Sequence, residues 1–523
     1  MEGIVDTVVL IVIAVAGAAI ARRLGFVAPL VLLVGGLGLS FVPGLPEIHI
    51  EPELVLIGIL PPLLYVAALQ TSVPAFRRAL RPIMLLAVGL VVFTALIVGF
   101  AVHWLLPAVP LSACVALGAV VAPPDAVSAT AIARRIGLPR RIVTILEGES
   151  LLNDATALVL LRVSTAALTG TAVGFWQIGR DVVLTAGGGV LIGFAAALVA
   201  AWLHKKIADP LLDDAVSLLT PFVVVILAEE LGTSSISAVV VAGLYLGHRI
   251  PYLLSPTSRL QMEAVWRLIT FLLEGAVFLL VGLQLRDLVS DLETGLATTI
   301  RTTALVVGLI VILRFVWMYP AYYLARLSPR VRREGRASPG SPTVLGWAGM
   351  RGVVTLAAVL TLPDPSEVAG GYPRDLFVFV AFAVIVVTLL AQGTTLPVVA
   401  RRLGVHEDTG TADALAEASV QNQASRAALK ALEDNADGAP ESVVERLRAI
   451  AENRNNGAWE RLGSQEQETP SAAYGRLRRE MIMAERHVFK LARNEGRIPE
   501  EVLTRAQRDL DLEESQLNRS ENE

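Results

Sequence analysis

Long apolar stretches separated by short polar segments run through the first 403 residues of the 523-residue chain. A helix needs about 20 residues to cross roughly 30 Å of hydrocarbon, and only a helix or a closed barrel satisfies its backbone groups without water. The pattern therefore predicts an all-α polytopic membrane protein. Thirteen stretches are candidate transmembrane helices: residues 4–21, 26–42, 54–70, 83–104, 111–133, 142–166, 181–203, 215–230, 234–248, 264–285, 302–326, 343–362 and 375–400.

The eighth and ninth stretches are the least clearly separated. Their boundary depends on Gly232-Thr233-Ser234 and on the acidic pair Glu229-Glu230. One long span would place both glutamates in lipid, where charged side chains are costly. Two spans are therefore predicted here.

The charges of the connecting loops alternate. Loops on one side carry 20 basic residues, five of them between residues 326 and 336, whereas those on the other side carry only Arg180, Arg286, Arg301 and Arg374. Because short cytoplasmic loops collect Lys and Arg, the N-terminus is expected outside and the C-terminal tail in the cytoplasm. Arginine far outnumbers lysine in the chain, which favours a bacterial inner membrane.

After Leu403 the pattern becomes polar, and 40 of the last 120 residues are charged. This divides the chain into a transmembrane domain, residues 1–403, and a cytoplasmic tail, residues 404–523. Apolar residues recur at helical spacing in 412–433, 441–453, 472–494 and 499–517, so the tail is expected to be helical. Two interpretations remain open: a tail that packs on itself or on the partner protomer, and a regulatory module that binds a regulator.

Composition supports this division and excludes several classes. The chain is 54% hydrophobic and 18% charged, with a mean hydropathy of +0.61, unlike a soluble enzyme. The net charge is plus 4 over residues 1–403 and minus 8 beyond them, and no basic face or motif indicates nucleic-acid binding. The single cysteine, Cys114, excludes a disulfide framework and a zinc site of several thiolates. Membrane lipids are the expected surroundings, and no cofactor is expected.

The fifth predicted span contains Pro123-Pro124-Asp125. Two consecutive prolines remove two backbone donors, so the helix is expected to break in mid-membrane. A broken helix leaves carbonyls and half-helix ends beside Asp125, where they can replace part of the hydration shell of a cation. The alternative is a simple proline kink with a paired aspartate.

The sixth predicted span carries three carboxylates within eight residues, Glu147, Glu149 and Asp154. Glu149 and Asn153 are four residues apart, as are Ser150 and Asp154, so the two pairs form adjacent stripes on one side of the helix. Asp154 is expected to meet Asp125 across the helix interface, which gives a monovalent cation two carboxylates together with hydroxyl and amide oxygens. The alternative is that these polar groups only hold helices together.

The twelfth predicted span contains Arg351 among glycines, in Gly349-Met350-Arg351-Gly352. A buried guanidinium needs an anionic partner, and Glu149 is the predicted one because a carboxylate fits its fork geometry. Glu274 and Arg314 are a second candidate structural pair. The two predicted breaks occupy the fifth span of the first six and the fifth of the last six, with 181–203 as a connector. This spacing suggests two inverted six-helix repeats whose broken helices cross at the midplane.

The chain resembles the monovalent cation:proton antiporter-1 family of sodium/proton exchangers. The resemblance covers about residues 1–403 and depends on three motifs: Pro123-Pro124-Asp125-Ala126-Val127, Glu147-Gly148-Glu149-Ser150-Leu151-Leu152-Asn153-Asp154-Ala155 and Met350-Arg351-Gly352. It implies thirteen helices, a homodimer, and a dimerisation domain and a core domain that move relative to each other.

The resemblance also implies roles for individual residues. Asp154 resembles the essential ion- and proton-binding aspartate, and Asp125 the aspartate of the unwound helix. Ser150 resembles an oxygen ligand, and Asn153 replaces an aspartate of electrogenic relatives, which implies electroneutral exchange. Glu149 and Arg351 match the buried ion pair of the family.

Two positions depart from the family pattern. Pro124, which is itself a candidate ion-binding residue together with Asp154, Asp125, Ser150 and Asn153, stands where many members have threonine. Val66 stands where many have a carboxylate. Val66 cannot ligate an ion.

The predicted function is exchange of Na⁺, Li⁺ or K⁺ for H⁺, with cation and proton competing for Asp154 and Asp125. A sodium-coupled organic solute symporter of similar inverted-repeat architecture is the alternative. An enzyme is not expected, because no histidine or metal-spaced pair lies at the centre of a span. The sequence leaves the preferred cation open.

Overall fold

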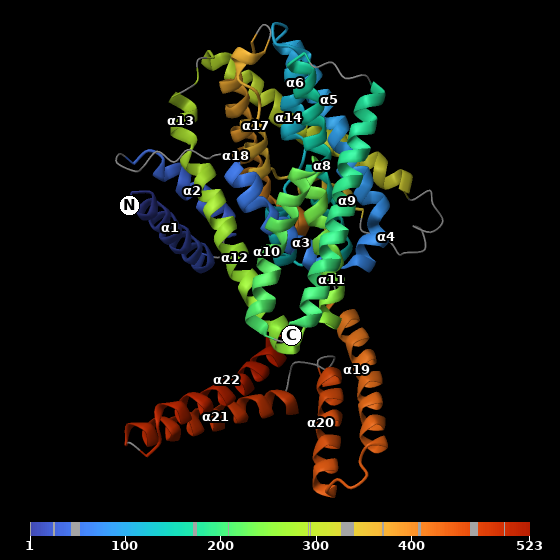
Figure 1. Cartoon of the computed structure of the whole chain (residues 1–523), viewed down its shortest axis with the longest axis vertical. Coiled ribbons are helices and arrows are strands. Elements are labelled where there is room, and N and C mark those ends of the chain that lie inside the picture. The colour runs from blue at the N-terminus through green and yellow to red at the C-terminus, as the bar shows by residue number, and fades with distance from the viewer. Residues whose placement is uncertain are drawn as a thin grey trace. The chain divides into compact units, whose positions relative to one another are not determined.

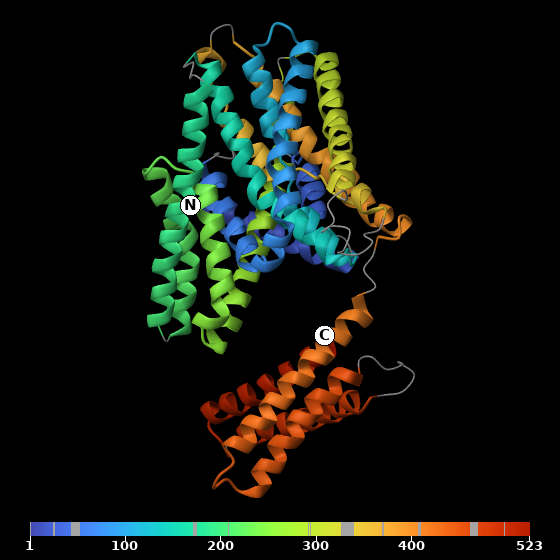
Figure 2. The same cartoon turned by 90° about the vertical axis from the view of Figure 1, so that its right-hand side faces the viewer.

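The computed structural model describes residues 2–24, 27–42, 53–170, 175–207, 209–290, 292, 294–325, 339–368, 371–405, 409–460, 469–495 and 497–522. These fall into two compact units, Met1–Glu407 and Asp408–Glu523 (Figures 1 and 2). The arginines at 330–336, predicted to lie in a basic loop, are outside the described residues.

The first unit is all-helical. In chain order its α-helices are α1 (Glu2–Leu24), α2 (Ala28–Leu39), α3 (Leu60–Gln70), α4 (Val73–Met84), α5 (Val91–Leu105), α6 (Leu111–Val121), α7 (Ala126–Arg135), α8 (Arg140–Leu168), α9 (Phe175–Lys206), α10 (Pro210–Glu230), α11 (Ser235–Leu253), α12 (Pro256–Leu283), α13 (Leu285–Ser290), α14 (Leu296–Ala325), α16 (Ser341–Trp347), α17 (Val353–Leu360) and α18 (Arg374–Arg402). The π-helical segments η1 (Leu54–Ile59) and η2 (Leu85–Leu90) precede α3 and α5, and the 3₁₀ turn η3 (Pro365–Glu367) precedes α18.

Eight helices within the described ranges are long and apolar enough to cross a membrane. They are Val73–Leu105, Arg140–Leu168, Val183–Lys206, Pro210–Glu230, Ser235–Leu253, Pro256–Ser290, Leu296–Leu324 and Arg374–Arg402. Of the other predicted spans, the first lies within α1, the second coincides with α2 and the third with η1 and α3. The fifth and twelfth are each divided into two, α6 with α7 and α16 with α17.

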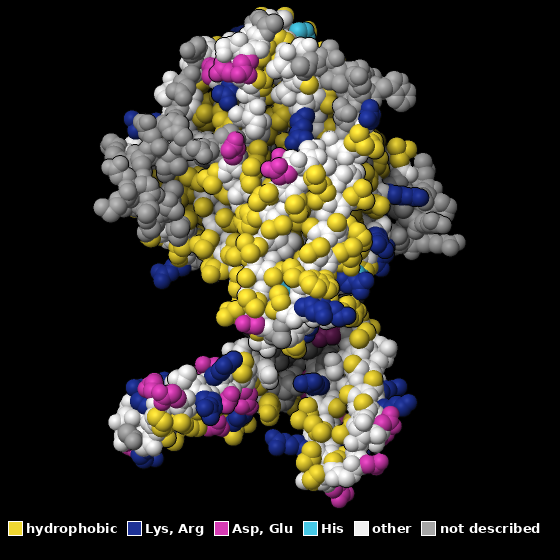
Figure 3. Space-filling view, in the orientation of Figure 1, with side chains coloured by type: hydrophobic (Ala, Val, Ile, Leu, Met, Phe, Trp, Pro, Cys, Tyr) yellow, Lys and Arg dark blue, Asp and Glu magenta, His cyan; other side chains and the backbone are white. Residues whose placement is uncertain are grey.

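The surface of this unit is apolar, as expected of a protein in lipid. Hydrophobic side chains cover much of the face seen in Figure 3. Large apolar residues point outward, among them Trp104, which is 82% exposed, and Leu191, which is 71% exposed. Because such side chains would be costly in water, the unit is a multi-pass membrane domain.

The boundary between the eighth and ninth predicted spans is confirmed. α10 ends at Glu230, Gly232 has φ +63°, and the Ser234 hydroxyl accepts a hydrogen bond from the Ser237 N–H at the start of α11. A left-handed residue after a helix and a serine before the next are typical of a stop and a start, so two helices form here.

Helix α8 lies inside the membrane unit and packs against α4, α6 and α7. Its buried face includes Glu149, Asn153 and Asp154, so these polar groups point into protein. On the other side of the unit, α12 packs along α2 at a distance set by glycines: a Cβ on Gly36 would lie 2.9 Å from Cα of Gly282. The polar side chains of α8 are thus enclosed by helices rather than by lipid.

The second unit contains α19 (Thr409–Asp434), α20 (Glu441–Glu460), α21 (Pro470–Asn494) and α22 (Glu500–Asn522). α19 packs on α20, and α21 packs on α22. Arg478 of α21 forms ion pairs with Glu485 and with Glu513 of α22, at 2.8 and 2.6 Å. This arrangement makes two antiparallel helical hairpins.

Candidate functional site

The predicted break in the fifth span is present. α6 ends at Val121, the chain passes through Pro123 and Pro124, and α7 begins at Ala126. Asp125 caps the new helix, because its Oδ2 accepts a hydrogen bond from the Ser128 N–H at 3.3 Å. The two half-helices therefore end and begin beside Asp125.

The second break meets the first. α16 ends at Trp347, α17 begins at Val353, and within the gap the Met350 carbonyl accepts a hydrogen bond from the Asp125 N–H at 2.7 Å. The two chains approach so closely that a Cβ on Gly352 would lie 2.6 Å from Cβ of Asp125. Only glycine allows this approach.

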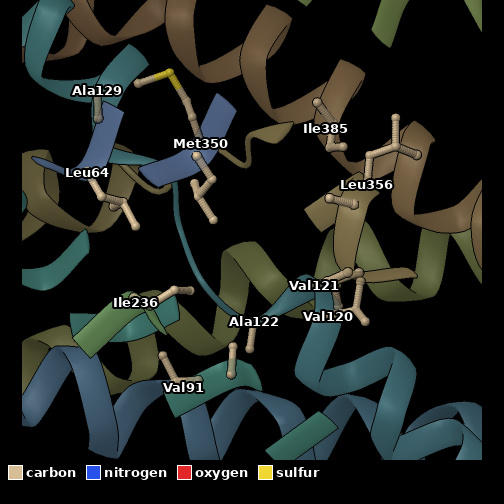
Figure 4. Close-up of a cluster of buried hydrophobic side chains, with 14 of the residues drawn as sticks. Leu64, Val91, Val120, Val121, Ala122, Ala129, Ile236, Met350, Leu356 and Ile385 are labelled. Carbon is tan, nitrogen blue, oxygen red and sulfur yellow. The ribbon is translucent and has the colours of Figure 1, made fainter. Parts of the chain in front are cut away.

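Apolar side chains surround the crossing of the two broken helices. Val121 and Ala122 at the end of α6, Met350 in the second break and Leu356 in α17 are all buried (Figure 4). The extended chain beyond Ala122 thus lies in the interior of the membrane unit, where its backbone polar groups need partners within the protein.

Arg351 supplies those partners, and its predicted pairing with Glu149 is wrong. The guanidinium donates from Nε to the Val121 carbonyl and from Nη2 to the Ala122 carbonyl, each at 3.0 Å, and from Nη1 to the Gly349 carbonyl. Arg351 is only 2% exposed. A helix C-terminus has unpaired carbonyls and a negative dipole end, so the end of α6 is itself the anionic partner that Arg351 requires.

Glu149 pairs with Arg314 of α14 instead. Nη1 of Arg314 donates to Oε1 at 2.7 Å and Nη2 donates to Oε2 at 2.9 Å, and both side chains are almost fully buried. The predicted pair of Glu274 with Arg314 is therefore wrong as well. Gly349 makes room for the guanidinium, since a Cβ there would lie 2.5 Å from Cδ of Arg314.

Asn153 connects α8 to the first break. Its Nδ2 donates to the Pro124 carbonyl at 2.7 Å, while its Oδ1 is buried and has no hydrogen-bond partner among the described residues. The Ser128 hydroxyl is likewise buried without a partner in that part of the chain. Ser128 is a residue of the site that the sequence motifs alone do not identify, although its place three residues after Asp125 is typical of the start of a capped helix.

The structure brings Asp154, Asp125 and Ser150 together at one cavity of about 420 Å³. Asp154 is 5% exposed, and no hydrogen bond or ion pair is formed by its carboxylate with any described residue. Glu274 of α12 lines the same cavity, far from its predicted role in a structural pair. Near the cavity mouth, Arg134 pairs with Glu147 and Arg267 pairs with Glu263.

A second, small void also touches Asp154. The small void there measures about 10 Å³ and is lined mainly by apolar side chains, including Ala157, Leu158 and Val354. A void of this size has room for no more than about one water molecule. Of these two spaces, the large cavity is the one with room for a ligand beside the Asp154 carboxylate.

A family comparison decides what kind of protein has this site. The sequence profile described as "Sodium/hydrogen exchanger, transmembrane" matches residues 9–402. The chain belongs to the sodium/hydrogen exchanger family. This is a family of transporters for monovalent cations and protons and not of enzymes, so the buried carboxylates lie in an antiporter fold.

Individual relatives agree with this assignment. An uncharacterized Na⁺/H⁺ exchanger of Mycobacterium tuberculosis is 34% identical over 531 residues, which cover 98% of this chain and 96% of that protein. A sodium, potassium, lithium and rubidium/H⁺ antiporter of Bacillus pumilus is 30% identical over 417 residues, covering 77% of this chain and 62% of that protein.

A solved structure shares the fold. The sodium proton antiporter MjNhaP1 from Methanocaldococcus jannaschii superimposes with a TM-score of 0.59 at 18% identity, covering 77% of this chain and 99% of that one.

Proposed function

We propose that this exchanger moves Na⁺, or Li⁺ or K⁺, in exchange for H⁺, with cation and proton competing for Asp154 beside Asp125. The proposal depends on the buried carboxylate of Asp154. This carboxylate faces the large cavity and has no hydrogen-bond or ion-pair partner among the described residues. A buried carboxylate of this kind needs either a proton or a cation to balance its charge. Competition for one site is sufficient for exchange.

The surrounding oxygens suit a hard monovalent cation. Asp125 and Ser150 line the cavity with Asp154. The Pro124 carbonyl and the unpaired Oδ1 of Asn153 lie at the adjoining break. Carbonyls of an unwound helix can replace water around an ion, and a proline at position 124 still offers its carbonyl.

Asn153 supports electroneutral exchange of one cation for one proton. Its amide donates to the Pro124 carbonyl, a contact that an ionised aspartate could not make because it has no donor. The position thus adds no charge to the site, and one proton balances one monovalent cation at Asp154.

The proposed mechanism is alternating access. The mouth lies by Arg134 and Arg267, residues next to the loops that the charge pattern assigns to the cytoplasm, so we assign this state as inward-facing. The proposal also includes thirteen spans in two inverted repeats and a homodimer. In a bacterial inner membrane, the N-terminus lies outside and the tail lies in the cytoplasm. The neutral loaded forms cross the apolar layer near Leu158, whereas the empty charged form does not.

The test is cation-induced pH change in proteoliposomes of the full-length protein, with Na⁺, Li⁺ and K⁺ in turn, with and without an imposed voltage. We expect exchange that does not depend on voltage, and we expect Asp154→Asn to abolish it. Asp364→Asn, the same change in an exposed turn, is the control and should exchange at the wild-type rate. Full activity of folded Asp154→Asn would refute the mechanism.

A further inference from the structure

Glu274 has no structural ion pair, because Arg314 binds Glu149 instead. It projects from α12 into the cavity that Asp125 lines from the break before α7 and Asp154 lines from α8. No described residue forms a hydrogen bond or ion pair with its carboxylate, and Asp125, which lines the same cavity, is also negative. Such a carboxylate adds nothing to the stability of the helix packing.

The Thr270 hydroxyl is a second observation that indicates a ligand beside the Glu274 carboxylate. It lies one helical turn before Glu274 and lines the same cavity, so both side chains share one face of α12. Its Oγ1 is buried and has no hydrogen-bond partner within the described ranges. A hydroxyl and a carboxylate four residues apart offer two oxygens to one cation.

The charge of the cavity also favours a cation at this position. Five carboxylates and two guanidinium groups line it, and the two arginines are already paired with Glu147 and Glu263. The remaining carboxylates are those of Asp125, Asp154 and Glu274, and those of Asp154 and Glu274 have no hydrogen-bond or ion-pair partner among the described residues. Within the described residues these three do not form a compact metal-binding cluster, so Glu274 is a separate position on the route rather than a further ligand beside Asp154.

We propose that Glu274, with the Thr270 hydroxyl, is a cation-specificity residue: it binds the incoming monovalent cation at the α12 wall before that cation reaches Asp154. This inference rests on the proposed exchange activity. The proposal assigns cation affinity and ion exchange to two different carboxylates. Glu274 sets the apparent affinity for the cation, whereas Asp154 carries the exchange itself.

The experiment measures exchange rate against Na⁺ and K⁺ concentration in proteoliposomes of Glu274→Gln, Glu274→Asp and the wild type. For Glu274→Gln we expect KM for Na⁺ to rise about tenfold, the factor that corresponds to roughly 1.4 kcal/mol of binding, with maximal rate retained. Glu274→Asp keeps the charge and should stay within about threefold of the wild-type KM. The ratio of Na⁺ to K⁺ affinity should change in Glu274→Gln.

Glu263→Gln is the matched control. It removes the same charge from the same helix at a side chain that is 63% exposed, so its KM should remain within about twofold of the wild-type value. An unchanged KM in Glu274→Gln, or an equal rise in both variants, would overturn the proposal. If Glu274→Gln fails to assemble, Thr270→Val takes its place, with an expected rise in KM of about threefold.

Different exchange results would refute the proposed function and the role of Glu274. Wild-type protein without cation-induced pH change, or Asp154→Asn with full activity, would refute the exchange mechanism. Normal wild-type exchange with an unaltered Glu274→Gln would refute only the role of Glu274.

Discussion

Glu149 and Arg314 form a two-point ion pair, at 2.7 and 2.9 Å, that joins α8 to α14 across 165 residues of sequence. Both side chains are almost completely buried. Replacing one partner leaves the other as an uncompensated charge away from water. This pair therefore controls assembly of the helices around the site.

Glu149→Gln should destabilise the membrane unit by about 3–5 kcal/mol, because it leaves the Arg314 guanidinium without its carboxylate. Thermal unfolding of the detergent-solubilised protein measures this loss. Glu147→Gln is the control, because its partner Arg134 is 57% exposed and exposed pairs contribute little. Equal melting temperatures for Glu149→Gln and the wild type would contradict the assignment.

Gly352→Ala should abolish exchange by separating the two breaks. The added methyl group would lie 2.6 Å from both Cβ and Cγ of Asp125, so the hydrogen bond from Asp125 to Met350 cannot persist. Exchange in proteoliposomes measures the effect. Gly308→Ala in α14 makes the same change where no atom lies within 4 Å, and it should retain wild-type exchange.

Arg351→Lys should lower the stability of the protein, because lysine cannot make the contacts of the arginine. A lysine ammonium is a point charge and cannot reproduce the planar fork that reaches Val121, Ala122 and Gly349. Loss of about two of these contacts at buried carbonyls should cost about 3 kcal/mol. We expect lower thermal stability with an unchanged order of cation preference, and altered preference in a stable protein would argue against a purely structural role.

Arg478→Gln should loosen the contact between α21 and α22 in the full-length protein. Arg478 donates to both carboxylate oxygens of Glu513, and these bonds hold the pKa of Glu513 below its ordinary value. Hydrogen exchange of both helices should accelerate in the variant. Arg497→Gln, which removes an ion pair with Glu495 at an exposed position, should leave that exchange unchanged.

The same pair has a defined pH dependence. Because the pKa of Glu513 is lowered in the folded state, its stabilising contribution is complete above the unfolded pKa, about 4.3, and is lost as pH falls through the lower folded value. Protection of α21 and α22 should therefore be equal at pH 7 and pH 6 after correction for intrinsic exchange. The gap in protection between the wild type and Arg478→Gln should also be the same at both values, and a gap that shrank from pH 7 to pH 6 would contradict the role of Glu513.

Local chemistry made several features predictable from the sequence. Pro123 and Pro124 lack backbone donors wherever they lie, so the break of α6 needs no tertiary information. The stripe of Glu149 and Asn153 follows from helical periodicity alone, and the structure buries both residues. Gly232 likewise marks the end of α10 through its backbone conformation.

Partner choice could not be predicted in the same way. Two arginines, Arg314 and Arg351, were equally able to neutralise Glu149, and spacing carries no information on how α8, α14 and the second break are rotated against one another. Gly349 leaves room for the Arg314 side chain that makes the contact, since a Cβ there would lie 2.5 Å from Cδ of Arg314. For the same reason the sequence could not show that Glu274 faces the cavity.

Arg351 reduces the negative charge that a transported ion has to balance. The guanidinium is bound to the Val121 and Ala122 carbonyls at the end of α6, and none of its hydrogen bonds with described residues goes to a carboxylate of the cavity. It acts as a resident counterion, so the negative helix end does not compete with Asp154 for each arriving Na⁺. One permanent charge thus stabilises the crossing of the broken helices, and the cargo has to balance only the carboxylates of the cavity.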